Sequence, residues 1–306
     1  MSFAGKVKDE LLGQTGKSRH CQLAELAALF TCCGQVILED EGNYIVKFST
    51  ENLTVLKKCY IVCKKALHIV PDLSIRGHHQ YLLYMLDDED SMAFLKAILF
   101  FDGAGAAEDK LLEKQCCKRA FLRGFFLACG SVTDPNSGYH LELAAGDYRR
   151  AVQIQEVMGV FGLEAKIIER KNLFVVYLKE GSAIVDFLNV MGAHIALMEY
   201  ENVRILKEMR NSINRQVNCE TANIKKTVSA ASRQLEDIRY IHDTTGFGNL
   251  SENLSRIARL RMDNPEVSLK ELGEMLEPPL GKSGVNHRLR KLSKIAQELR
   301  KINTEV

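Results

Sequence analysis

The sequence lacks any apolar run near the ~20 residues that a membrane-spanning helix needs. Its first residues, 1–14, mix Lys6, Lys8, Asp9 and Glu10 with apolar positions, so they form no apolar signal-peptide core. Charged residues make up 26% of the chain, a share typical of soluble globular proteins. We therefore expect a cytoplasmic protein that has no membrane partner.

The chain also lacks the cysteine pattern of a disulfide-bonded or zinc-binding protein. Its nine cysteines are an odd number, two pairs are adjacent (Cys32–Cys33 and Cys116–Cys117), and no two are spaced C-x₂-C. Metal binding through cysteines is an alternative, because Cys59 and Cys63 lie one helical turn apart. We expect reduced, buried or half-buried thiols instead, with no metal and no cofactor.

Net charge is small, +2 over 306 residues, but it is unevenly distributed. Residues 1–195 carry 22 Lys and Arg against 24 Asp and Glu, whereas residues 196–306 carry 19 against 15. The stretch 281–301 alone holds seven basic residues and one acid, Glu298. A basic segment on a near-neutral body indicates one face that binds a polyanion.

Two segments of the first 195 residues resemble each other. Residues 26–34 and 122–130 are apolar, rich in small side chains, and end on Gly34 and Gly130. Each is followed by a strand pattern at 44–48 or 139–143, a helical pattern, a second strand pattern at 81–85 or 174–178, and a last helix. The unit, helix, one or two strands, helix, strand, helix, is thus present twice.

The opening helix of each unit carries small residues at helical spacing, Ala27 and Ala28 in the first and Gly124 and Ala128 in the second. Such residues let two helix backbones approach closely, although two ordinary buried helices would also fit the composition. We expect the glycine that ends each helix to adopt the left-handed conformation of a C-terminal cap.

These two segments resemble the LAGLIDADG motif of homing endonucleases, in which two such helices pack together at the domain interface. In that family the residue before the final glycine is an acid that holds a catalytic divalent metal. The corresponding residues here are Cys33 and Cys129, and a soft thiol is a poor ligand for Mg²⁺. The resemblance implies the fold of a nuclease whose catalytic positions are degenerate.

From residue 193 to about 241 the chain has no glycine or proline, and its apolar positions recur at helical spacing. This pattern predicts one long helix or two consecutive ones. Its polar face is either a solvated surface or a set of accessory DNA contacts, because Arg and Lys hold phosphate oxygens. The candidate accessory residues are Arg204, Lys207, Arg210, Arg215, Lys225 and Lys226.

The last segment predicts a helix-turn-helix. A helix over 250–262 is followed by a short helix over 269–276, for which Ser268 and Glu271 form a capping box. Pro278 and Pro279 lie in the connection, and we expect Ser283 to cap a third helix that ends near residue 300. The Gly281-Lys-Ser283 sequence lacks the earlier glycine of a phosphate-binding loop. We accordingly expect no small-molecule substrate.

At about 100° per residue, Val285, Leu289, Leu292, Ala296 and Leu299 share one stripe of the third helix. The opposite face presents side chains suited to base edges and phosphates. A three-helix bundle with a basic surface is the alternative to DNA recognition. The predicted DNA-binding residues are Lys282, Ser283, Asn286, His287, Arg290, Lys291 and Lys294.

The expected fold is α+β: a duplicated LAGLIDADG-like domain at 1–195 (repeats about 1–103 and 104–195), a helical linker at 196–245, and an all-α helix-turn-helix domain at 246–306. This combination resembles the WhiA family of bacterial DNA-binding proteins. The resemblance rests on Ser2-Phe3 and the residues after it, on 201–223, and on 265–292.

The resemblance implies a non-enzymatic transcription regulator or nucleoid-associated factor that acts in cell division, chromosome segregation and, in some lineages, sporulation. Double-stranded DNA is the expected partner. The net −2 of residues 1–195 favours a surface for another regulatory protein over a second DNA surface. The alternative is an active LAGLIDADG-type endonuclease that uses other acids, such as Asp134.

Overall fold

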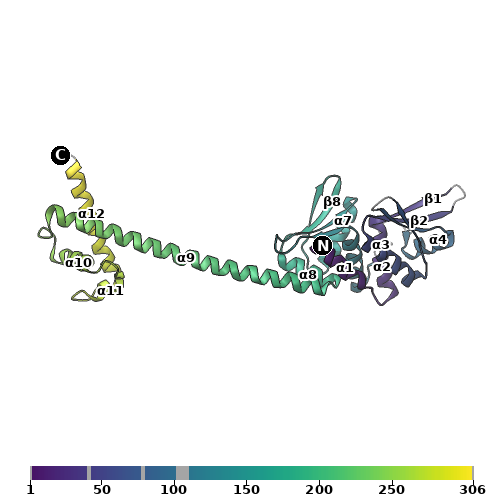
Figure 1. Ribbon diagram of the computed structural model, residues 1–306, viewed down its shortest axis with the longest axis horizontal. Coiled ribbons are helices and arrows are strands. Elements are labelled where there is room, and N and C mark those ends of the chain that lie inside the picture. Colours follow the sequence, from purple (N-terminus) through teal and green to yellow (C-terminus); the bar gives the residue numbers. More distant parts are fainter. Residues whose placement is uncertain (1, 40–42, 77–79, 101–109, 305–306) are drawn as a thin grey trace. The chain divides into compact units, whose positions relative to one another are not determined.

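The computed structural model describes residues 2–39, 43–76, 80–100 and 110–304 (Figure 1). The chain divides into two compact units, Met1–Glu208 and Met209–Val306. The expected boundary between the repeats, at 103/104, lies outside the described residues.

The N-terminal unit contains the same order of elements twice. The first repeat comprises α2 (Arg19–Cys33), β1 (Gly34–Leu38), β2 (Tyr44–Thr50), α3 (Leu53–Leu67), β3 (Asp72–Arg76), β4 (Gln80–Met85) and α4 (Asp88–Ala97). The second comprises α6 (Gln115–Cys129), β5 (Gly130–Val132), β6 (Leu141–Ala145), α7 (Tyr148–Gly159), β7 (Lys166–Arg170), β8 (Leu173–Leu178) and α8 (Gly181–Met191). The predicted α+β duplication is confirmed.

Each repeat forms one antiparallel sheet, in the order β1-β2-β4-β3 and β5-β6-β8-β7. Strands β3 and β7 are not predicted by the sequence patterns. Both are five-residue edge strands in which no side chain is fully buried. In β3 the apolar residues Leu73 and Ile75 do alternate with polar ones but are exposed, and in β7 the two isoleucines, Ile167 and Ile168, are adjacent. Helix α1 (Phe3–Gly13) is a further element that was not predicted, and it buries Phe3, Val7 and Leu11 at a four-residue spacing.

The helices α2 and α6 pack along each other at the centre of the N-terminal unit, and Gly124 is needed for their close approach. A Cβ at this position would lie 2.6 Å from the carbonyl oxygen of Glu25 and 3.0 Å from the Cβ of Ala28. The predicted role of small residues in bringing the two backbones together is therefore confirmed.

The expected left-handed caps at Gly34 and Gly130 are wrong. Their φ values are −90° and −96°, because each glycine is already the first residue of a strand, β1 or β5. Glycine is needed here for space instead. A Cβ would lie 2.1 Å from the Phe30 ring at Gly34 and 2.5 Å from the Phe126 ring at Gly130.

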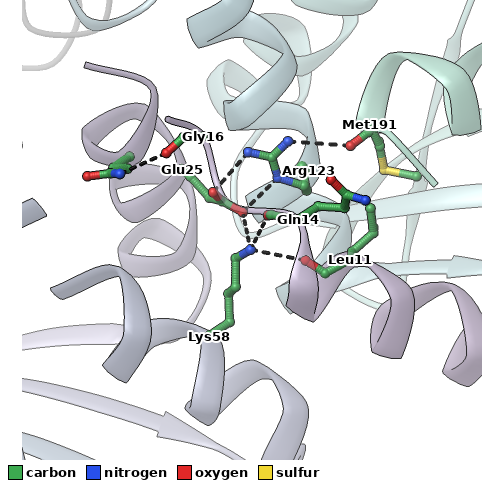
Figure 2. Close-up of polar contacts among 8 residues, drawn as sticks. Leu11, Gln14, Gly16, Glu25, Lys58, Arg123 and Met191 are labelled. Atoms are coloured by element: carbon green, nitrogen blue, oxygen red, sulfur yellow. Dashed lines mark hydrogen bonds and ion pairs between the residues drawn. The ribbon is translucent and has the colours of Figure 1, made fainter. Parts of the chain in front are cut away.

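A buried ion pair joins the two repeats (Figure 2). The Glu25 carboxylate of α2 accepts hydrogen bonds from Arg123 of α6, at 2.8 Å from Nε and 3.0 Å from Nη2. The Glu25 side chain is fully buried and that of Arg123 is 11% exposed. Arg123 also donates from Nη1 to the carbonyl oxygen of Met191 at the end of α8. One carboxylate thus ties α2 to the second repeat.

A second cation, Lys58 of α3, reaches the same carboxylate, with its Nζ 3.1 Å from Glu25 Oε1. Its ammonium also donates to the carbonyl oxygens of Leu11 and Gln14 at the end of α1 (Figure 2). Burial lowers the pKa of Lys58, and the Glu25 charge opposes that shift. These contacts make Glu25 the shared partner of two buried or nearly buried cations.

Helix α9 (His194–Thr245) is one uninterrupted helix of 52 residues, which decides between the two readings of this segment. Its first turns bury Ala196 and Tyr200 in the N-terminal unit, and Ile238 and Ile241 belong to the core of the C-terminal unit. The residues between, 208–230, are exposed. The C-terminal unit further contains α10 (Glu252–Asp263), α11 (Leu269–Glu274) and α12 (Lys282–Thr304).

Candidate nucleic-acid interface

The core of the C-terminal unit fixes which face of α12 points outward. Val285, Leu289, Leu292 and Ala296 are buried at spacings of three and four residues, as predicted. They pack with Ile257 of α10, Leu272 of α11 and the end of α9. Because one face of α12 is buried in this core, the opposite face of its first turns is held toward solvent.

The short helix α11 has the predicted N-terminal cap. Ser268 Oγ accepts a hydrogen bond from the Glu271 backbone N–H at 3.3 Å, and Glu271 Oε2 accepts from the Ser268 N–H at 3.0 Å. This reciprocal pair is a capping box. Hydrogen bonding of the Glu271 carboxylate to Ser268, to its side chain first and then to its backbone N–H, favours the ionised form and lowers the pKa of Glu271.

Gly273 positions α12 against α11. The backbone N–H of Leu280 donates to the Gly273 carbonyl at 2.9 Å, which closes the connection between the two helices. A Cβ at Gly273 would lie only 2.0 Å from the Leu280 carbonyl oxygen and 3.1 Å from Val285 Cγ2. Any side chain here would push the connection and the start of α12 away from α11.

The prediction that Ser283 caps α12 is wrong by two residues. The helix begins at Lys282, and the Gly281 carbonyl accepts the first helical hydrogen bond, from the Val285 N–H at 3.1 Å. Ser283 therefore lies within the first turn, where its side chain is exposed. The candidates Lys282 and His287 beside it are exposed as well.

The predicted DNA-binding residues lie together on this outward face. Asn286 is half-buried at the edge of the core stripe, and the other six are exposed. The face combines four cations with hydroxyl, amide and imidazole groups over little more than three helical turns. The exposed members are Lys282, Ser283, His287, Arg290, Lys291 and Lys294.

Arg300, one of the basic residues of the segment 281–301, interacts with other residues of the C-terminal unit. Arg300 Nη1 lies 2.7 Å from Asp237 Oδ1, and the guanidinium lies 4.8 Å from the centre of the Tyr240 ring. These contacts fasten the end of α12 to α9. The surplus charge of the segment is consequently concentrated on its first half, where the candidate residues lie.

The candidate accessory residues of α9 divide into two groups. Arg204 is held by Glu201 at 2.5 Å and Glu208 at 2.6 Å, and Lys207 donates to the Pro135 and Asn136 carbonyl oxygens at 2.6 and 2.7 Å. These four contacts engage both side chains within the N-terminal unit. The other four are exposed on α9: Arg210, Arg215, Lys225 and Lys226.

The degenerate nuclease positions lie at the last residues of α2 and α6. The Cys33 thiol donates a hydrogen bond to the Leu29 carbonyl oxygen of the same helix, at 3.0 Å. A hydrogen bond from the Cys32 thiol lowers the pKa of Cys129, helped by the Lys8 ammonium. Among the described residues, no group of three or more potential ligands surrounds Cys33 or Cys129.

Asp134, the acid named for the nuclease alternative, stabilises a turn. Its Oδ1 accepts hydrogen bonds from the Asn136 backbone N–H at 2.8 Å and from Asn136 Nδ2 at 3.0 Å. These bonds lower the pKa of this exposed carboxyl. Its hydrogen bonds account for its place in the loop after β5.

A duplicated LAGLIDADG-like unit followed by a helix-turn-helix unit defines the class of this protein. Family models for the WhiA N-terminal LAGLIDADG-like domain, the WhiA LAGLIDADG-like domain and the WhiA C-terminal helix-turn-helix domain match residues 19–82, 118–210 and 213–296. The chain belongs to the WhiA family.

Relatives and a solved structure match nearly the full length of the chain. It is 50% identical to the probable cell division protein WhiA of Lachnoclostridium phytofermentans, over 98% of this chain and all of that one. It is 45% identical to the same-named protein of Alkaliphilus oremlandii, over 98% of both. The crystal structure of full-length WhiA from Thermatoga maritima matches with a TM-score of 0.61 at 27% identity, over 97% of this chain and 99% of that one.

No helix in the described part of the chain is both long enough and apolar enough to cross a membrane.

Proposed function

We propose that the chain is a sequence-specific double-stranded DNA-binding protein that regulates transcription in cell division. The observation that carries this proposal is the outward face of α12. It presents Asn286 and Arg290 for base edges and Lys291 and Lys294 for flanking phosphates, on a helix whose other face is fixed by the core. The family and the names of the relatives favour the process.

The cellular setting is part of the same proposal. We infer association with the nucleoid in the cytoplasm and a contribution to chromosome segregation and, in some lineages, sporulation. Chromatin immunoprecipitation with sequencing tests this. We expect discrete sites that share one DNA motif and lie near cell-division genes, whereas binding spread evenly along the chromosome would contradict sequence-specific regulation.

Arg290→Ala and Asn286→Ala should each weaken binding to the specific site by about 1–3 kcal/mol, because each would remove hydrogen bonds to one base pair. Fluorescence anisotropy on the full chain, with specific and scrambled duplexes, measures this. Lys57→Ala, which removes an exposed charge from α3, is the control. Unchanged affinity of Arg290→Ala for the specific duplex would mean that α12 does not read bases.

Lys294→Ala should instead weaken binding to all duplexes alike, because a phosphate contact carries no sequence information. The slope of log affinity against log salt should fall in magnitude by about 1. The same titration at several salt concentrations, on the specific and the scrambled duplex, measures both effects. A loss confined to the specific duplex would reassign Lys294 to base recognition.

For the N-terminal unit we propose a regulatory surface for another protein, since its sequence carries a net charge of −2 over residues 1–195. Arg210, Arg215, Lys225 and Lys226 of α9 are proposed as accessory phosphate contacts. A full chain with Lys282, Arg290, Lys291 and Lys294 all changed to Ala separates the contributions. The salt slope that remains should disappear when the four α9 residues are also changed, and a large slope persisting would place DNA contacts in the N-terminal unit.

We propose that the protein does not cleave DNA, because thiols stand where the LAGLIDADG resemblance requires metal-binding acids. Incubation of the purified chain with plasmid carrying its bound sites and Mg²⁺ or Mn²⁺ tests this. No linear product is expected. A single metal-dependent linear product that Asp134→Ala abolishes would show the endonuclease instead.

A further inference from the structure

The two central helices of the N-terminal unit begin side by side, and each begins with a pair of metal-ligating residues. His20 and Cys21 are the second and third residues of α2, and Cys116 and Cys117 are the second and third of α6. Cys21 lies 13 residues before Gly34, and Cys117 lies 13 residues before Gly130. The internal duplication therefore brings two pairs that are 95 or more residues apart in sequence to equivalent places.

The four side chains converge. His20 Nδ1 lies 3.2 Å from Cys117 Sγ and 3.3 Å from Cys21 Sγ, and the four potential ligand atoms all lie within 4.8 Å of one another. Tetrahedral zinc with Zn–S of about 2.3 Å and Zn–N of about 2.0 Å places sulfurs about 3.8 Å apart and sulfur about 3.5 Å from nitrogen. Rotations about the side-chain torsions that move the ligand atoms by about an ångström would complete that geometry.

Burial raises the pKa of the Cys21 and Cys117 thiols, and nearby helix ends and cations offset that cost for a charged centre. Three thiolates and one neutral imidazole around Zn²⁺ carry a net charge of −1, and helix N-termini stabilise thiolates and other anions. Neither α2 nor α6 has a side-chain hydrogen bond at its N-cap, so no capping side chain competes for the N–H groups of the first turns. Lys17, Lys114 and Arg119 line the pocket beside the cluster.

The position also allows a metal to enter. His20, Cys21 and Cys116 line an open pocket of about 510 Å³, and the His20 and Cys116 side chains are exposed while Cys21 and Cys117 are buried. Three sulfurs and one nitrogen form a soft ligand set that selects zinc over magnesium or calcium. Among the described residues this is the one group of three or more potential ligands close enough to share an ion.

We propose that His20, Cys21, Cys116 and Cys117 bind one zinc ion, which fastens the first turns of α2 and α6 to each other. The site is structural, because all four positions are filled by protein ligands. It is independent of DNA binding by α12. It also departs from the sequence expectation of no metal, which rested on the absence of a C-x₂-C pair.

Metal analysis of the full chain tests the proposal. The protein is produced with zinc in the medium and purified under reducing conditions. Inductively coupled plasma mass spectrometry should then find about one zinc ion per chain. Replacement by Co²⁺ should give the visible bands of tetrahedral cobalt and a thiolate-to-cobalt charge-transfer band. Chelation should lower the thermal midpoint of the wild-type chain.

Cys116→Ser is the informative variant, because Cys116 is exposed and its replacement leaves the core intact. We expect the rate at which a chelator removes zinc from this variant to be at least tenfold higher than for the wild type. The cobalt-substituted variant should lose part of the charge-transfer band. His20→Ala should also lose zinc faster. Cys219→Ser, which changes the exposed thiol of α9, is the matched control and should retain the metal.

Three results would overturn the proposal: reduced wild-type protein with no stoichiometric zinc and no cobalt spectrum, Cys116→Ser with unchanged metal content and spectrum, or metal lost equally from Cys219→Ser. A Cys21–Cys117 disulfide in metal-free protein, found by peptide mass spectrometry together with no cobalt spectrum, would also contradict it by assigning the pair to redox chemistry.

Discussion

Glu25→Ala is expected to lower the free energy of unfolding of the N-terminal unit by about 3–5 kcal/mol, since it leaves Arg123 and the fully buried Lys58 without their shared counter-charge. Through these two ion pairs, the Glu25 carboxylate of α2 is joined to α3 and to α6. The loss should therefore affect both repeats together. Chemical denaturation followed by circular dichroism measures the change.

The control for this variant is Glu51→Ala. Glu51 is exposed just before α3, so its removal should change the free energy of unfolding by less than about 0.5 kcal/mol. Glu25→Gln, which keeps the size but not the charge, should fall between the two. If Glu25→Ala were as mild as Glu51→Ala, the ion pair would not hold the repeats together.

Gly273→Ala should destabilise the C-terminal unit by about 1–3 kcal/mol, because the new Cβ would lie 2.0 Å from the Leu280 carbonyl oxygen. The intrinsic preference of alanine for a helix, about 1 kcal/mol over glycine, opposes but does not cancel a clash with the backbone. The shift would tilt the start of α12, so affinity for DNA should fall as well. Hydrogen exchange of α11 and α12 measures the local loss.

Gly281→Ala provides the comparison within the same connection. A Cβ there meets nothing within 4 Å, so this variant should fold and bind DNA like the original chain. Equal protection of α12 in the two variants would show that Gly273 does not set the position of α12.

Patterns that repeat along the sequence predicted most of the fold. The spacing of Val285, Leu289 and Leu292 predicted the buried stripe of α12, and the Ser268–Glu271 pair predicted the cap of α11, because both depend on residues a few positions apart. The Ser283 cap was misplaced since helix ends depend on backbone geometry, which residue types determine only loosely.

Contacts between distant residues could not be predicted in the same way. Glu25 stands within an apolar helix pattern, and nothing local pairs it with Arg123, 98 positions away. His20 and Cys117 are 97 positions apart, and only the packing of α2 against α6 makes them neighbours. A signal was nevertheless present: aligning the two repeats on Gly34 and Gly130 places Cys21 opposite Cys117.

Selection from a random duplex library tests most directly whether the outward face of α12 reads DNA sequence. The full chain and its Arg290→Ala variant would each be carried through the same rounds, with Lys57→Ala as control. We predict one enriched motif for the wild type and Lys57→Ala, and loss of preference at one base position for Arg290→Ala. The same motif with undiminished preference at every position in Arg290→Ala would contradict the account.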